Sequence, residues 1–161
     1  MGDSAQGRVR RTFLVVVDES EEMRAALRYA CRRARRTGGQ VALLRIIQPR
    51  EIQHYALIGE RMADELRYQA SSHLNELAAD VQHISGTAPV LLIREGESSE
   101  ELLKLLQDKP NISVLVLAAG TGADGPGPLV SALTGRLAHL VRIPVTIVPG
   151  AMTDDAIDFM T

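Results

Sequence analysis

Short apolar runs alternate with helix-like segments along almost the whole chain, and this alternation constrains the fold more than any other feature. The runs are five in number and cover residues 12–17, 40–47, 89–94, 113–119 and 143–148. Continuous apolar strands of this kind are typical of a parallel sheet that is buried on both faces. We therefore predict an α/β fold, a single doubly wound five-stranded parallel sheet with helices on both faces and right-handed crossovers.

The segments between these runs have helical periodicity in most cases. A helix is expected after Ser20, which is placed to cap it, and a long outer helix is expected over residues 60–83. Ser98 and Glu101 form a capping box ahead of a third helix, and residues 129–141 read as a fourth. Residues 50–59 have no clear period. The resulting order is βαβαβαβαβ.

Size and composition indicate one domain between two tails. The chain has 161 residues, of which 45% are hydrophobic, so one substantial core is expected. We assign residues 12–149 to this domain, residues 1–11 to a flexible basic N-terminal tail, and residues 150–161 to a loose acidic C-terminal tail.

Charge and residue usage narrow the classes of partner. The net charge of -2 provides no general attraction to nucleic acid or an anionic membrane, and aromatic residues make up only 3%. The single cysteine, Cys31, excludes an internal disulfide, and no signal peptide or long apolar span is evident. The histidines lack metal-ligand spacing. We expect a cytoplasmic protein with no metal site, no nucleic-acid partner and no membrane partner.

A glycine-rich loop, Gly120-Thr-Gly-Ala-Asp-Gly-Pro-Gly-Pro128, joins the fourth strand to the fourth helix. Glycines let backbone amides turn toward an anion, and the N-terminus of a helix adds further unpaired N–H groups. The loop is therefore a candidate phosphate site, the alternative being an ordinary solvent turn. Gly120, Gly122 and Gly125 match the dinucleotide fingerprint, but that fingerprint belongs to the first βαβ unit of a dinucleotide-binding fold, and here the chain is nearly finished. A P-loop is also excluded, because Pro126 occupies the position of its lysine.

Other polar residues are expected near this loop. Asp18 follows the first strand, where its carboxylate could accept a hydrogen bond from a ribose hydroxyl or an exocyclic amine, or could cap the next helix. Ser131 and Thr134 could complete a phosphate nest, and Arg136 is a weaker candidate for neutralising phosphate charge. Ser131 lacks the GxSxG elbow of a hydrolase nucleophile.

The span from about Arg11 to Pro149 resembles the universal stress protein family. Phe13-Leu-Val-Val-Val-Asp18 is similar to the opening strand of that family and its nucleotide-facing aspartate. Leu43-Leu-Arg-Ile-Ile-Gln-Pro49 is similar to its second strand, Arg94-Glu-Gly96 to the turn before its third helix, and Ile143-Pro144-Val145-Thr-Ile-Val148 to its closing strand.

This resemblance implies the adenine nucleotide alpha hydrolase-like fold, with strand order 3-2-1-4-5, and a homodimer paired through the closing strand. In one branch of the family ATP lies between the first and fourth strands, whereas another branch lacks nucleotide. Carried over by position, the nucleotide-binding residues are Asp18 on the adenosine, Ile46 at the adenine edge, Ala119, Gly120, Gly122 and Gly125 along the phosphates, and Ser131, Ala132 and Thr134 at the following helix.

The loop departs from the nucleotide pattern of the family, Gly-x2-Gly-x9-Gly-Ser/Thr. Gly122, Gly125 and Gly135 reproduce the spacing, but Arg136 replaces the hydroxyl residue. Counting back from the closing strand instead places Ser131-Ala132 at the Gly-Ser position. Pro126 and Pro128 supply no N–H group. The loop is therefore a degenerate form of the ATP-binding motif.

These observations lead to one main functional hypothesis and two alternatives. The main hypothesis is a stress-response module that binds ATP or a related adenine nucleotide, with or without Mg²⁺, as a regulatory ligand. Because no residue set positions an attacking water, it is not expected to be an enzyme, and any hydrolysis of ATP would be slow. The alternatives are a member without nucleotide that acts through homodimerisation and protein partners, and an enzyme of another class, such as a small nucleotidyl transferase.

Overall fold

The computed structural model describes residues 9–56 and 59–161, and its central element is a five-stranded parallel sheet. The strands are β1 (Thr12–Val16), β2 (Gln40–Ile47), β3 (Val90–Glu95), β4 (Ile112–Ala119) and β5 (Val145–Pro149). Their order is β3-β2-β1-β4-β5, and all four neighbouring pairs are parallel. The predicted fold class and strand order are confirmed, and β5 begins two residues later than predicted.

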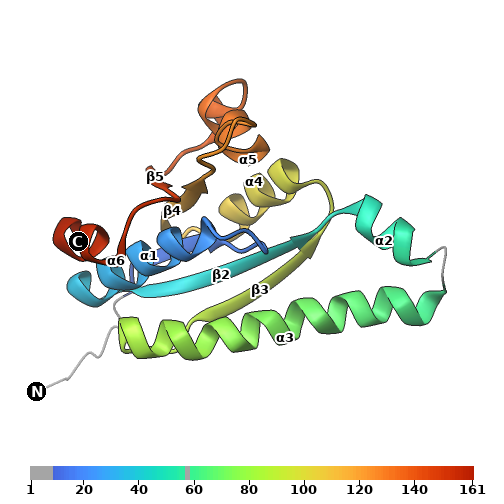
Figure 1. Ribbon diagram of the computed structural model, residues 1–161, viewed down its shortest axis with the longest axis horizontal. Helices are drawn as coiled ribbons and strands as arrows, with labels where there is room; N and C mark the ends of the chain where they lie inside the picture. The colour runs from blue at the N-terminus through green and yellow to red at the C-terminus, as the bar shows by residue number, and fades with distance from the viewer. Residues whose placement is uncertain (1–8, 57–58) are drawn as a thin grey trace, which may run out of the picture.

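Two layers of helices cover the sheet (Figure 1). The helices are α1 (Met23–Thr37), α2 (Pro49–Ala56), α3 (Glu60–Ser85), α4 (Ser98–Asp108), α5 (Pro128–Thr134) and α6 (Asp154–Met160), with a 3₁₀ turn η1 (Ala138–Leu140). Side chains of α1, α3 and α6 share one core with the sheet, whereas α4 and α5 share the other. In the described part of the chain, no helix combines the length and apolar character needed to cross a bilayer.

The core between α1 and the sheet is built from small side chains on the helix. Ala25, Ala30, Cys31 and Ala34 are all fully buried. Short side chains bring the helix close to the sheet and allow the dense packing typical of protein interiors. Burial also raises the pKa of the Cys31 thiol to about 12, so this cysteine is an unreactive packing residue.

The C-terminal segment is not the loose tail predicted from its acidic composition. It forms α6, which begins after Thr153, whose hydroxyl oxygen accepts a hydrogen bond from the Ala156 amide. Ile157 is fully buried in the core shared with α1. The prediction was wrong because this short helix is stabilised by partners on α1, about 130 residues earlier, and a local pattern of seven residues contains little of that information.

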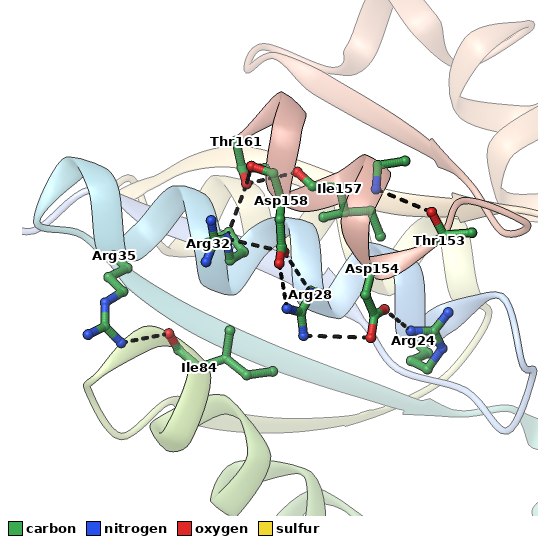
Figure 2. Close-up of polar contacts among 11 residues, drawn as sticks. Arg24, Arg28, Arg32, Arg35, Ile84, Thr153, Asp154, Ile157, Asp158 and Thr161 are labelled. Atoms are coloured by element: carbon green, nitrogen blue, oxygen red, sulfur yellow. Dashed lines mark hydrogen bonds and ion pairs between the residues drawn. The ribbon is translucent and has the colours of Figure 1, made fainter.

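Ion pairs hold α6 against α1, and we call this contact the α1–α6 seam (Figure 2). Arg28 binds both carboxylate oxygens of Asp158, with its Nε and Nη2 atoms each 2.8 Å away. Arg32 Nε lies 3.3 Å from Asp158, and Arg24 pairs with Asp154. The hydrogen bond from Arg28 lowers the pKa of Asp158 below its usual value and raises the pKa of Arg28.

The predicted helix over residues 129–141 is divided in the structure. The first part, α5, ends at Thr134, and the chain resumes as the short turn η1. Gly135 has φ and ψ of −109° and −113°, far from helical values, and a Cβ atom there would lie 2.8 Å from the Ser131 carbonyl oxygen. The glycine therefore interrupts the helical periodicity that its neighbours suggest.

Other local expectations also need correction. Residues 50–59 were predicted to lack a period, but most of them belong to α2, where the Glu51 carboxylate accepts a hydrogen bond from the Gln48 amide at the helix start. The N-cap of α4 is Glu97, which accepts from the Glu100 amide at 2.9 Å, so Ser98 is the first helical residue and not the cap. The prediction for residues 1–8 lies outside the described residues, as does that for 57–58.

Candidate functional site

A crevice lies at the carboxyl ends of the central strands, on the side where the strand order reverses. From β1 the chain continues to β2 on one side, whereas β4 pairs with the other side of β1. Ligands of open α/β sheets bind at such switch points. The crevice has a volume of about 280 Å³, close to the lower end of the ~300–1,000 Å³ typical of ligand pockets.

Some of the residues predicted to bind nucleotide line this crevice and others do not. Those that line it are Asp18, Ile46, Gly120 and Gly125, whereas Ala119, Gly122, Ser131, Ala132 and Thr134 are not among the lining residues. The hydroxyl of Thr134 instead donates to the Val130 carbonyl, 2.7 Å away. The fourth strand and the loop thus reach the crevice, but the hydroxyl-bearing part of α5 does not.

Asp18 is exposed at the mouth of the crevice and holds the turn after β1. Its Oδ1 atom accepts hydrogen bonds from the backbone amide of Ser20, at 2.8 Å, and from the Ser20 hydroxyl, at 2.5 Å. Oδ2 has no hydrogen-bond partner in the part of the chain that the structure describes. Ser20 does not cap α1 as predicted, because its hydroxyl is used by Asp18 and the N-cap position is Glu22.

The Ile46 carbonyl faces the crevice, as the alternation of hydrogen bonds along β2 requires. Leu44 O accepts from the Val17 amide on the β1 side, and Ile47 O accepts from the Gly96 amide on the β3 side. Alternate carbonyls of a strand point to opposite neighbours, so Ile46 O points past the end of β1. There it accepts a hydrogen bond from the guanidinium of Arg45.

Arg45 was not singled out in the sequence, although it lines the crevice. Its side chain is 15% exposed, and its Nη2 atom lies 3.1 Å from the Glu51 carboxylate on α2. The available signal was the position of this arginine inside an otherwise apolar strand, where a charged side chain needs a specific partner. Its partners, Glu51 and the Ile46 carbonyl, depend on how α2 packs beside β2.

The glycine loop is closed by its own hydrogen bonds. The Gly120 amide donates to Pro126 O at 3.1 Å, and the Gly125 amide donates to Gly122 O at 3.2 Å. A Cβ atom at Gly120 would lie 2.9 Å from Gly125 O, so this close approach requires glycine. Gly127, with φ of 108°, turns the chain into α5 and accepts from the Ser131 amide. The loop therefore already uses two of its own amide donors, those of Gly120 and Gly125.

Charged side chains around the crevice are mostly acidic. Asp18 and Glu22 line it together with Arg45, whose charge is balanced by Glu51. Arg136, the weaker phosphate candidate, is exposed and does not line the crevice. Arg136 instead makes a minor contribution to lowering the pKa of Glu97, which is lowered mainly by the Glu100 amide at the start of α4.

Comparison with known proteins assigns the chain to a family. A model of the universal stress protein family matches residues 10–149. The chain belongs to the universal stress protein family. Among curated proteins, none matches it at a significant level.

Solved structures of universal stress proteins have the same fold. UspA from Lactobacillus plantarum has a TM-score of 0.68 and 20% identity, over 86% of this chain and 98% of that one. A universal stress protein from Archaeoglobus fulgidus has a TM-score of 0.65 and 19% identity, over 89% and 96%. A universal stress protein in complex with cAMP has a TM-score of 0.52 and 18% identity, over 88% and 98%.

Two parts of this universal stress protein differ from what the family pattern implies. Gly135, which fits the literal spacing of the nucleotide pattern, lies in the turn after α5 and not beside the crevice. In addition, α6 lies beyond the residues that the family model matches. The segment leading to α6 returns to the crevice wall, because Gly150 donates to Ala119 O at 2.9 Å and packs against the side chain of Glu22.

Proposed function

We propose that this universal stress protein binds an adenine nucleotide in the crevice as a regulatory ligand. The observation that supports the proposal is that Asp18, Gly120 and Gly125 line one crevice at the switch between β1 and β4. A structural relative that shares the fold is described in complex with cAMP. ATP, with or without Mg²⁺, and related adenine nucleotides are the ligands to be tested first.

We assign a role in this complex to each residue that the sequence predicted to bind nucleotide. Oδ2 of Asp18 accepts a hydrogen bond from a ribose hydroxyl, while Oδ1 keeps its bonds to Ser20. The exocyclic amine of adenine replaces Arg45 at the Ile46 carbonyl. Gly120 and Gly125 face the phosphate. Ala119, Gly122, Ser131, Ala132 and Thr134 shape this region from outside the crevice.

We propose that the protein binds the nucleotide without hydrolysing it. We also propose that it is located in the cytoplasm. None of the described residues that line the crevice is a histidine or a cysteine, and we assign Oδ2 of Asp18, the oxygen that Ser20 leaves free, to the ribose hydroxyl. A general base needs a free, well-placed acceptor beside the attacking group. The crevice favours recognition of a nucleoside over activation of water.

Calorimetry with purified protein tests this function. Asp18→Ala should weaken the binding of adenosine ligands at least tenfold, because a hydrogen bond to a charged acceptor contributes about 1.5–3 kcal/mol. Asp18→Asn keeps an oxygen for Ser20 and separates the loss of charge from the loss of the turn. Asp108→Ala, at the far end of α4, is the matched control. If the wild-type protein shows no binding, or if the Asp18 variants bind normally, the proposal is wrong.

The outer edge of β5 supports a second candidate, in which the protein acts through homodimerisation. Among the described residues, β5 pairs only with β4, and Ile147 is 38% exposed. Pro144 O accepts from the Leu115 amide of β4, so by alternation the Ile147 amide points outward. An open edge strand can extend its sheet with the edge of a second copy.

Light scattering tests this candidate. Ile147→Pro removes the outward N–H group and is compatible with an edge strand, so it should convert a dimer to a folded monomer. Leu91→Pro on the opposite edge is the control, because the Gly96 amide donates to Ile47 O and by alternation the Leu91 amide points outward from β3. A protein that is monomeric without any substitution would contradict this candidate and leave the nucleotide proposal intact.

A further inference from the structure

We infer that the crevice selects an adenine ligand with at most one phosphate group, such as adenosine, AMP or a cyclic monophosphate, and disfavours the triphosphate. This inference rests on the proposed function and concerns the chemistry of the same site. It follows from three properties of the crevice: the state of its backbone donors, the sign of its charges and its size.

Among the five loop residues that line the crevice, only Gly127 has an amide that is free for a phosphate. The amides of Gly120 and Gly125 already donate within the loop, and the Ser131 amide donates to Gly127 O. Pro126 and Pro128 have no N–H group. α5 has seven residues and is too short to provide a strong dipole. A triphosphate would have to break these internal hydrogen bonds before the Gly120 and Gly125 amides could bind it.

Charges at the crevice oppose added phosphates. Asp18 and Glu22 both line it, and the stem of Glu22 packs against Gly150, which limits withdrawal of its carboxylate. Arg45 is the only cationic side chain among the described lining residues, and it is paired with Glu51. Arg45 belongs to β2, and β1 lies between β2 and β4, the strand that leads into the loop. Each further phosphate adds negative charge to a crevice whose described lining includes no unpaired cation.

The size of the crevice supports the same conclusion. A volume of about 280 Å³ is small among ligand pockets. The end nearest the loop is bounded by the contact between Gly120 and the Gly125 carbonyl and by the Pro126 ring. The base and ribose can lie between Asp18 and Ile46, and one phosphate reaches the mouth of the loop.

A series of ligands that differ only in phosphate number tests this inference. Adenosine, AMP, cAMP, ADP and ATP are titrated separately by calorimetry, each with and without Mg²⁺. We expect the tightest of adenosine, AMP and cAMP to bind at least tenfold more tightly than ATP under both conditions. ATP binding as tightly as AMP, with or without Mg²⁺, would overturn the inference and leave the proposed function standing. No binding by any ligand would overturn both.

A charge-neutral variant of one lining residue tests the electrostatic part directly. Glu22→Gln should improve ATP affinity relative to adenosine by about threefold to tenfold, because it removes a fixed negative charge near the phosphates. Glu21→Gln is the matched control, since Glu21 is exposed, adjacent in sequence and outside the crevice lining. Equal changes in ATP and adenosine affinity, or the same change in both variants, would count against the inference.

Discussion

The α1–α6 seam and the crevice both bring arginines and carboxylates together, but they differ in charge balance and in what lies beneath the charges. In the seam, Arg28 binds Asp158 through two hydrogen bonds, directly beside the fully buried Ile157. In the crevice, Asp18 and Glu22 form no ion pair with the described residues, and Arg45, the one arginine of the described lining, is paired with Glu51. Balanced charges over an apolar contact stabilise the fold. An unbalanced set around a cavity leaves groups free for a ligand.

Among changes in the α1–α6 seam, loss of the apolar contact made by Ile157 should lower the stability of the fold most. Ile157→Ala should lower the free energy of unfolding by about 2–4 kcal/mol, because it removes buried methyl groups and leaves a cavity. Urea unfolding followed by circular dichroism measures the change. Phe159→Ala, at a side chain that is 93% exposed, should change stability by less than about 0.5 kcal/mol. Similar losses for both variants would show that α6 does not pack through Ile157.

Loss of the ion pairs should have a smaller effect than loss of Ile157. Arg28→Met keeps much of the apolar stem but removes both hydrogen bonds to Asp158. The urea midpoint should fall by less than half of the fall for Ile157→Ala, because partly exposed pairs contribute little beyond their desolvation cost. Arg33→Met is the control, since among the described residues the Arg33 guanidinium forms no ion pair or hydrogen bond, and only its backbone carbonyl accepts one, from the Thr37 hydroxyl. A larger loss than that for Ile157→Ala would reverse this ranking of the two contacts.

The stability that the α1–α6 seam provides should also depend on pH, and the lowered pKa of Asp158 sets the direction of this dependence. A carboxylate whose pKa is lower in the folded state stabilises the protein above its unfolded pKa, about 3.9 for aspartate, and this contribution is lost as the pH falls through the folded value. Comparing urea midpoints of the wild type and Asp158→Asn at pH 7 and at pH 3 tests this. The difference between them should be largest at pH 7 and should decrease at pH 3. A difference that grows as the pH falls would contradict the assignment.

Ligand binding in the crevice should be sensitive to Gly120→Ala, a substitution that the rest of the fold should tolerate. Gly120→Ala places a Cβ atom 2.9 Å from Gly125 O, so the loop must shift. Ligand affinity should fall severalfold, while the urea midpoint changes little because the loop is exposed. Thr121→Ala is the control, since Thr121 is an exposed residue of the same loop and lies outside the crevice lining. A large loss of stability in Gly120→Ala, with normal ligand affinity, would assign the loop to the fold and not to the site.

The sheet could be predicted from the sequence because the apolar pattern that indicates each strand lies within the strand itself. Each strand is a continuous apolar run, and the alternation with helices determines the parallel arrangement. The bounds of the helices were predicted less accurately where a single residue overrides the apolar periodicity. Gly135 ends α5 early, and the Glu51 carboxylate starts α2 in a segment without a clear period.

The site was only partly predictable because its geometry depends on contacts between distant segments. Asp18 and Gly120 were placed by strand ends alone. The internal bonds of the glycine loop, the capping of Ile46 O by Arg45 and the contact of Gly150 with Glu22 all require the packed structure. The spacing of the glycines indicated donors for phosphate, but spacing does not show which of those donors are already used.

The central position of β1 has a consequence for how the chain reaches this structure. β1 pairs with β2 shortly after it in the sequence, but its other edge pairs Thr12 with Ile112, on the order of 100 residues later. Closing so long a segment is slow, and during synthesis the apolar edge of β1 stays uncovered until β4 has emerged. The C-terminal third of the chain therefore completes the central sheet, and nascent chains that lack it present an open apolar edge that is a target for chaperones and a risk for aggregation.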